Sequence, residues 1–291
     1  EDKLKRKLSK IGESLVVVQD EDIVKVHVHT LTPGEALNLG QRYGEFIKLK
    51  IENMTYQHEQ LIVEKDEEKP HKKYALITVA TGEGLTEMFR ELRVDVVISG
   101  GQTMNPSTED FVSAIKGLNA DHVIILPNNS NIILAAQQAQ SVFEDDVDVI
   151  VVPTKSIPQG LSACIMFNPE GEVEDNIAEM NAAAGNVCTG QVTYAIKDTT
   201  FDGLEIHEGD YMGIKEKTIV SSVQDKMETT RNLVDSMLKA SEYEIVTLIA
   251  GEDTTEEELQ QMESYITDTY DLEVESHIGG QAVYSFIIGA E

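Results

Sequence analysis

Tyr74-Ala-Leu-Ile-Thr-Val-Ala-Thr-Gly-Glu-Gly84 is the stretch that decides the fold of most of this 291-residue chain. Residues 74–80 form an apolar run with the length of one strand, Thr81 and Gly82 supply a turn, and a helical pattern starts at Glu83. A short apolar strand that leads directly into a helix is typical of a parallel sheet with helices on both faces. The stretch therefore predicts the first βα unit of an α/β domain.

The same pattern repeats three times after this unit. Apolar strands followed by helices are predicted at residues 94–99 with a helix from Pro106, at 122–126 with a helix from Asn131, and at 147–152 with a helix from Pro158. Four βα units with short apolar strands predict a parallel sheet that is covered on both sides.

The pattern changes near Gly190, where strands joined by tight polar turns replace the βα units. The predicted elements are strands at 191–196, 211–214 and 218–221, a helix at 225–240, a strand at 243–250, a helix at 255–270, and strands at 272–277 and 284–288. This mixture predicts an α+β lobe that packs on the first lobe. Residues 74–291 would then form one domain with lobes at about 74–189 and 190–291.

The first 56 residues predict a separate, small α+β unit. Leu4, Leu8 and Ile11 recur at helical spacing, strands are predicted at 14–18, 23–30 and 46–51, and Thr32-Pro33-Gly34 opens a second helix. The valines at 24, 26 and 28 alternate with polar residues and are expected to face the core. Residues 57–73 are polar and charged without apolar periodicity, so they are the predicted linker.

Composition restricts the partners and the compartment. Lys and Arg total 23 and Asp and Glu total 52, so a net charge of −29 would repel nucleic acid and anionic membrane surfaces. No apolar run approaches the roughly 18 residues that span a bilayer, and no export signal is visible. Two cysteines, Cys164 and Cys188, are too few for a disulfide scaffold. We expect a cytoplasmic protein, and the start without Met inside a helical pattern suggests a fragment.

Val24-Lys-Val-His-Val-His29 places two histidines on one face of a strand, because side chains alternate there. His27 and His29 could bind one zinc ion from this face. The alternative is an ordinary strand with exposed polar residues. A third ligand is missing, and His58 is the nearest candidate.

Residues 99–110, Ser-Gly-Gly-Gln-Thr-Met-Asn-Pro-Ser-Thr-Glu-Asp, form the most unusual stretch. We expect Asn105 to cap a helix that begins at Pro106, which leaves backbone N–H groups at a positive helix end. Hydroxyl groups beside that end suit a carboxylate or a phosphate, although a well-capped helix start explains part of the pattern. The candidate residues are Gly100, Gly101, Thr103, Asn105, Ser107 and Thr108.

Other strand ends carry similar residues, and in an open parallel sheet these loops share the carboxyl edge, where ligands bind. Asn128 follows the third strand of the parallel sheet, and Lys155 is a single cation after the fourth. His277 precedes a Gly-Gly turn near the end of the chain, where a structural role is the alternative. Each loop alone is weak evidence. The sequence contains no complete dinucleotide fingerprint, Walker loop, GxSxG or HExxH motif, so no catalytic set is visible.

Four motifs resemble those of FakA, the kinase component of fatty acid kinases, and the resemblance runs over essentially the whole chain. They are Val24-Lys-Val-His-Val-His-Thr30, Gly100-Gly-Gln-Thr-Met-Asn-Pro-Ser-Thr108, Leu126-Pro-Asn-Asn129 and Val152-Pro-Thr-Lys-Ser-Ile-Pro-Gln-Gly160. Gly203-Leu-Glu-Ile206 and His277-Ile-Gly-Gly-Gln281 follow in register.

The resemblance implies a three-part protein: an ATP-binding domain of the dihydroxyacetone kinase L type, a middle domain, and a DegV-like carboxyl-terminal domain. This chain would carry the end of the middle domain and all of the last. Structural zinc would be held by His27, His29 and a cysteine upstream of Glu1, and ATP and magnesium would bind only in the absent amino-terminal domain. The full kinase subunit, expected to be a homodimer, would phosphorylate a fatty acid carried by a DegV-type partner subunit to give an acyl-phosphate for phospholipid synthesis.

Three functions remain open at this point. In the first, residues 74–291 form a platform that docks the lipid-carrying partner, and this chain alone has no kinase activity. In the second, the chain itself holds a fatty acid, with the carboxylate at Thr103, Ser107 or Thr108 and His277. The third, a zinc hydrolase built on His27 and His29, would need a further ligand and a general base.

Overall fold

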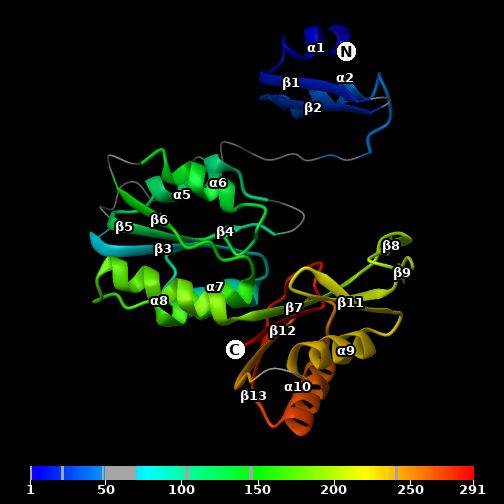
Figure 1. Ribbon diagram of the computed structural model, residues 1–291. Helices are drawn as coiled ribbons and strands as arrows, with labels where there is room; N and C mark the ends of the chain where they lie inside the picture. The colour runs from blue at the N-terminus through cyan, green and yellow to red at the C-terminus, as the bar shows by residue number, and fades with distance from the viewer. Residues whose placement is uncertain are drawn as a thin grey trace. The chain divides into compact units, whose positions relative to one another are not determined.

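The structure is a computed structural model that describes residues 2–20, 23–47, 49, 70–101, 105–143, 147–239 and 242–291. The chain separates into two compact units, residues 1–68 and 69–291 (Figure 1). Each unit is described by itself below.

The first unit contains two helices and an antiparallel strand pair. Its elements are α1 (Asp2–Leu8), β1 (Glu13–Asp20), β2 (Ile23–His29) and α2 (Pro33–Gly40). Leu4 and Leu8 of α1 are buried, as the helical spacing predicts. The predicted strand at 46–51 is wrong at residues 46, 47 and 49, and its remaining residues lie outside the described part.

The valines of β2 correct one expectation. Val17 of β1 is only 6% exposed, and its register partner Val26 lies on the same face of the strand pair. Val26 is nevertheless 41% exposed and Val24 is 43% exposed, so the prediction that they face the core is wrong. The seven-residue helix α1 is too short to cover both strands of this face along their length.

The second unit begins with the predicted parallel sheet. Its four strands are β3 (Lys72–Ala80), β4 (Val96–Ser99), β5 (Ala120–Leu126) and β6 (Asp148–Val151). They pair in the order β4-β3-β5-β6 and every pair is parallel, which confirms the predicted α/β class. The order reverses between β3 and β5, because the chain first moves outward to β4 and then returns to the other side of β3.

Helices cover both faces of this sheet, because alternate residues of each strand point to opposite sides. Leu76 belongs to a core with α4 (Glu83–Glu91), α7 (Ile157–Met166) and α8 (Val173–Asn186). Its neighbour Ile77 belongs to the opposite core with α5 (Thr108–Lys116) and α6 (Ile133–Gln140). Figure 1 shows α5 and α6 on one side and α7 and α8 on the other. Helix α8 is an element that the sequence pattern does not predict.

A six-stranded mixed sheet forms the second lobe, as the α+β prediction requires. Its strands, in spatial order, are β11 (Thr218–Val223), β10 (Tyr211–Lys215), β7 (Cys188–Tyr194), β14 (Phe286–Ala290), β12 (Ile245–Ala250) and β13 (Glu273–Ile278). Only the β12–β13 pair is parallel. Helices α9 (Lys226–Leu238) and α10 (Glu256–Tyr270) pack on one face, and a short hairpin of β8 (Thr199–Phe201) and β9 (Leu204–Ile206) extends from the lobe (Figure 1).

The two lobes of this unit share one hydrophobic core. Ile249 of β12 and Ile287 of β14 belong to the same buried cluster as Leu85 and Leu161 of the first lobe. The hydroxyl of Ser162 donates a 2.8 Å hydrogen bond to the Glu291 side chain across the same boundary. Over the described ranges, no helix has the length and apolar character needed to cross a membrane.

Candidate functional site

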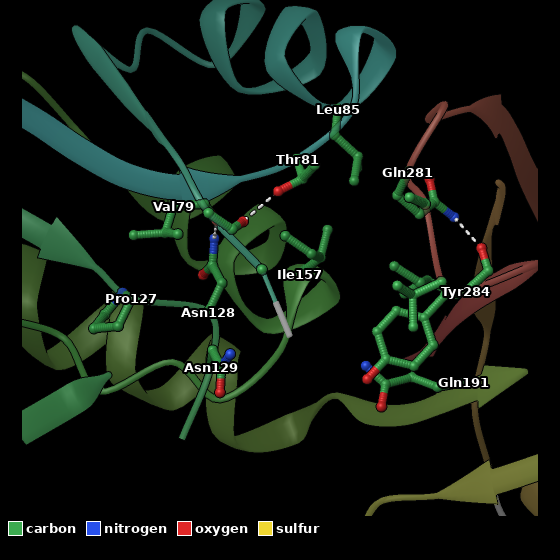
Figure 2. A pocket seen from close by; sticks show the side chains of 15 residues that line it. Val79, Thr81, Leu85, Pro127, Asn128, Asn129, Ile157, Gln191, Gln281 and Tyr284 are labelled. Carbon is green, nitrogen blue, oxygen red and sulfur yellow. Dashed lines mark hydrogen bonds between the residues drawn. The ribbon is translucent and has the colours of Figure 1, made fainter. Parts of the chain in front are cut away.

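A small cavity lies where the carboxyl edge of the parallel sheet meets the second lobe (Figure 2). The strand order reverses between β3 and β5, and ligands of open α/β sheets bind at such switch points. Figure 2 shows Val79, Thr81, Pro127, Asn128 and Asn129 on one side of the cavity. Gln191, Gln281 and Tyr284 of the second lobe lie on the other side. The cavity is therefore built from both lobes.

Asn128 ties three strand ends together on the first-lobe side. Its Nδ2 donates to Thr78 Oγ1 at 2.8 Å and to the Val79 carbonyl at 3.0 Å. Its Oδ1 accepts from Thr154 Oγ1 at 2.8 Å, and its backbone N–H donates to the same hydroxyl oxygen at 3.0 Å. Asn128 is 7% exposed, so these bonds satisfy an amide that has little access to water.

The approach of α7 to Asn128 requires a glycine. A Cβ atom on Gly160 would overlap the side-chain amide of Asn128. The glycine in the Pro158-Gln-Gly160 segment thus lets the first turns of α7 pack directly on the polar network at the sheet edge.

The second-lobe wall is a tight turn between β13 and β14. Gln281 is 3% exposed, and its Nε2 donates to the carbonyl groups of Ile249 and Tyr284 at 3.3 and 3.2 Å. Among the described residues, its Oε1 is buried without a hydrogen-bond partner. Val283 has a φ of +75°, a strained conformation for a β-branched residue, and its carbonyl accepts from Thr193 Oγ1 at 2.7 Å. This wall is held in a fixed, costly conformation.

The amino-terminal end of α4 is closed by the second lobe. The backbone N–H of Leu85 donates to the Gly279 carbonyl at 3.1 Å. A Cβ atom on Gly84 would overlap the Ile278 carbonyl oxygen, and one on Gly82 would overlap that of Gly279. A helix end at this position can bind an anion in other proteins. Here a peptide carbonyl of the same chain takes part of that place.

Only some of the candidate edge residues line the cavity. Gly100, Gly101 and Asn128 do, and the Gly100 carbonyl accepts a hydrogen bond from Thr81. Asn105 lies beside the cavity wall, where its Oδ1 accepts from Asn129 Nδ2 at 3.4 Å. Thr103 lies outside the described residues.

The hydroxyl-bearing helix start differs from the prediction. Ser107, and not Asn105, is the N-cap, and α5 begins at Thr108. Ser107 accepts from the Asp110 N–H while the Asp110 carboxylate accepts from the Ser107 N–H at 2.7 Å, a reciprocal capping box that outcompetes Asn105. Ser107 Oγ also donates to Asp110, and Thr108 Oγ1 donates to Gln138 at 2.9 Å. Both hydroxyl groups are therefore committed to local hydrogen bonds.

Lys155 and His277 are not among the residues that line the cavity. Lys155 is exposed, and its backbone N–H donates to Gln159 Oε1 at 2.8 Å. His277 is half-buried on the edge strand β13, in register with Ile249.

His27 and His29 occupy alternate positions of β2, as predicted, and His29 is exposed. The described side chains include no group of three or more His, Cys, Asp or Glu residues that could hold a metal ion. Two imidazoles would fill half of a four-coordinate zinc site, so further ligands must come from elsewhere.

The cavity is small and uncharged. Its volume is about 80 Å³, whereas sites for drug-sized ligands start near about 300 Å³. None of the fifteen residues that line it carries a charge. A carboxylate would find amide and hydroxyl groups among these lining residues but no cation, and a long acyl chain does not fit.

Comparison with known proteins agrees with this architecture. Residues 75–291 match the FakA-like C-terminal domain of fatty acid kinase subunits, and residues 1–61 match the FakA-like middle domain. This chain belongs to the FakA-like family. Protein YloV of Bacillus subtilis is 47% identical over 291 residues, which cover 98% of this chain and 52% of YloV. The chain thus spans about half the length of the curated relatives that it matches.

Solved structures with the same fold come from DegV proteins. A DegV lipid-binding protein of Thermotoga maritima superposes with a TM-score of 0.57 at 12% identity, over 75% of this chain and 98% of its own. A second Thermotoga maritima protein, for which a fatty acid binding function was described, gives 0.57 at 14% identity, over 76% and 99%. At these identities the likeness concerns the fold. The predicted DegV-like architecture is confirmed.

Sequence reasoning misses the second-lobe side of the cavity. Gln191 and Tyr284 carry no motif, and their place depends on how β7 and β14 pair in the folded lobe. The Gly279-Gly-Gln281 turn is visible in the sequence, but there it points to His277 and not to Gln281.

Proposed function

We propose that this chain is the part of a fatty acid kinase that docks a DegV-type subunit carrying the fatty acid. The observation that carries the proposal is a DegV-like fold whose space between the lobes is only about 80 Å³. A fold can keep its architecture after its ligand site has closed, and its surface can then serve recognition. Membership of the FakA-like family supports the same role.

The chemistry belongs to the longer protein in this proposal. ATP and magnesium bind in a domain outside these residues. The longer protein, a cytoplasmic homodimer, transfers a phosphoryl group to the carboxylate of the fatty acid held by the partner. His27 and His29 contribute to a structural zinc site completed by a ligand from outside this chain. The resulting acyl-phosphate would feed phospholipid synthesis.

The test is a calorimetric titration of this chain with an oleate-loaded DegV-type subunit from the same organism at moderate salt. We expect saturable 1:1 binding without added ATP, because docking needs no nucleotide. The same chain mixed with the loaded partner and Mg-ATP should form no acyl-phosphate. An absence of heat at any concentration, or acyl-phosphate formed by this chain, would refute the assignment.

The fatty-acid-holding alternative rests on the two Thermotoga maritima proteins of the same fold, which are described as binding lipid or fatty acid. The cavity volume, the uncharged lining and the closed end of α4 oppose it. Organic extraction of the purified chain followed by lipid mass spectrometry decides between the two functions. A stoichiometric fatty acid would restore the alternative.

A further inference from the structure

The β8–β9 hairpin is a preformed projection and not a loose loop. Phe201 pairs with Leu204 across a two-residue turn, Asp202-Gly203, in which φ is +50° and +84°. Two positive φ angles and an Asp-Gly sequence are typical of the type I′ turn that closes tight hairpins. Figure 1 shows the hairpin at the end of β7 that is remote from the parallel sheet. We call residues 195–209 the arm.

The base of the arm is fixed by hydrogen bonds. The Ala195 N–H donates to the Asp210 carbonyl and the Gly209 N–H donates to the Ala195 carbonyl, both at 2.8 Å. Asp210 is 5% exposed, and its carboxylate accepts from the His207 N–H at 3.0 Å. A rigid base lowers the ordering entropy that a partner would have to overcome on binding.

The arm has one apolar face that the chain covers only at its base. Directly opposed residues of an antiparallel pair share a face, so Phe201, Leu204, Thr199 and Ile206 lie on one face, and Thr200 and Glu205 on the other. Ile206 is 1% exposed and β9 contacts β11, Leu204 is half-buried, and Phe201 at the tip is 42% exposed. Exposure thus increases along the apolar face toward the tip. An exposed aromatic side chain on a rigid support is typical of binding hot spots.

Charge restricts what can cover this face. The arm carries the exposed carboxylates Asp198, Asp202, Glu205 and Glu208 against one lysine, Lys197, so its net charge is −3 with His207 neutral. A second copy of a chain with a net charge of −29, or an anionic membrane, would be repelled. A basic protein surface with an apolar hollow is complementary.

We propose that the arm is the element that docks the fatty-acid-carrying subunit, with Phe201 and Leu204 entering an apolar hollow that lysine or arginine residues surround on the partner. This inference rests on the proposed docking function and names the surface that performs it. The carboxylates around the apolar face orient the encounter, and burial of the two side chains holds the complex.

The experiment compares three forms of the complete chain in titrations with the oleate-loaded DegV-type subunit. F201S/L204S should weaken binding at least tenfold, because two partly exposed anchors are lost. L134S is the matched control, since Leu134 on α6 is an equally plain apolar side chain that is 65% exposed, and its affinity should stay within twofold. Affinity of the wild-type chain should fall as salt is raised. Thermal melting verifies that all three are folded.

Hydrogen–deuterium exchange on the unmodified chain supplies a readout that needs no variant: partner binding should slow exchange in residues 195–209. Unchanged affinity of F201S/L204S with unchanged exchange would overturn the arm while leaving the docking function intact. An equal loss in L134S would also overturn it. Failure of the wild-type chain to bind would remove both proposals, and wild-type dimerisation that F201S/L204S abolishes would assign the arm to a second copy.

Discussion

Asn128 is the residue on which the edge of the parallel sheet depends. It adopts a φ of +57°, it is buried, and its side chain bonds to residues of β3 and to Thr154 after β6. These bonds leave no room beside the amide, because Gly160 of α7 packs directly against it. The geometry of the edge therefore depends on one amide and one glycine together.

Gly160→Ala should lower the free energy of unfolding by about 2–4 kcal/mol, because overpacking costs about 1–3 kcal/mol and displaced buried hydrogen bonds add to it. Urea denaturation measures the loss. Gly185→Ala in α8 is the control, since a Cβ there meets nothing within 4 Å, and alanine in a helix is expected to raise stability by up to about 1 kcal/mol. Equal stability of Gly160→Ala and the wild-type chain would contradict the packing described for Asn128.

Helices α9 and α10 of the second lobe are joined by one carboxylate. Asp235 of α9 accepts hydrogen bonds from the hydroxyls of Tyr265 and Tyr270 of α10, at 2.7 and 2.6 Å, and from Lys239 at 2.8 Å. Burial alone would raise the pKa of Asp235, but the hydrogen bonds from Lys239, Tyr270 and Tyr265 outweigh it and lower the pKa below 3.8. The ionised form is thus the one that the folded state prefers.

Asp235→Asn should cost about 1–2 kcal/mol at pH 7, because hydrogen bonds to an ionised acceptor are about twice as strong as neutral ones. Since the folded pKa is lowered, this contribution is complete above the ordinary value of 3.8 and disappears as the pH falls through the folded pKa. The difference between wild type and variant in urea unfolding should therefore shrink in acid. Asp268→Asn, an exposed position on α10, should show no such pH-dependent difference.

The elements that the sequence predicts well are those with a strong apolar pattern, and the missed ones lack it. β3 and β5 are nearly continuous apolar runs, and their predicted bounds lie within two residues of the observed ones. Helix α8 escapes prediction because its buried positions are filled by Asn176, Met180 and Ala184, which give little contrast with their neighbours. The arm escapes it because its strands have three residues each, although Asp202-Gly203 is a clear hairpin signal.

The candidate site is predictable only in its first-lobe half. The rule that parallel strands end at one edge leads to Gly100, Gly101 and Asn128, because it needs only the order of strands and loops. The predicted N-cap is wrong because Asn105 and Ser107 are both good caps, and only the reciprocal bonds with Asp110 decide between them. Gln281 and Tyr284 cannot be assigned from the sequence, since their position depends on long-range packing of the two lobes.

At the scale of the whole unit, the two lobes are held together where backbone meets backbone. Leu85 N–H bonds to the Gly279 carbonyl, and the absence of a side chain at Gly84 lets the Ile278 carbonyl approach α4. The same contact closes the helix end that could otherwise receive an anion. Association of the lobes and closure of the ligand edge are thus one structural event.

Gly84→Ala should push the lobes apart at this contact and lower the free energy of unfolding by about 2–3 kcal/mol, because the added methyl group meets a backbone carbonyl that no side-chain rotation can move. Hydrogen–deuterium exchange should become faster in peptides containing Leu85 and in those containing residues 279–285, on both sides of the boundary. Gly185→Ala, also inside a helix, should leave exchange at both places unchanged. If Gly84→Ala accelerates exchange in α4 alone, the contact serves that helix and not the association of the lobes. Acceleration on both sides, accompanied by fatty acid uptake that the wild-type chain does not show, would mean that this contact is what keeps the DegV-like edge closed.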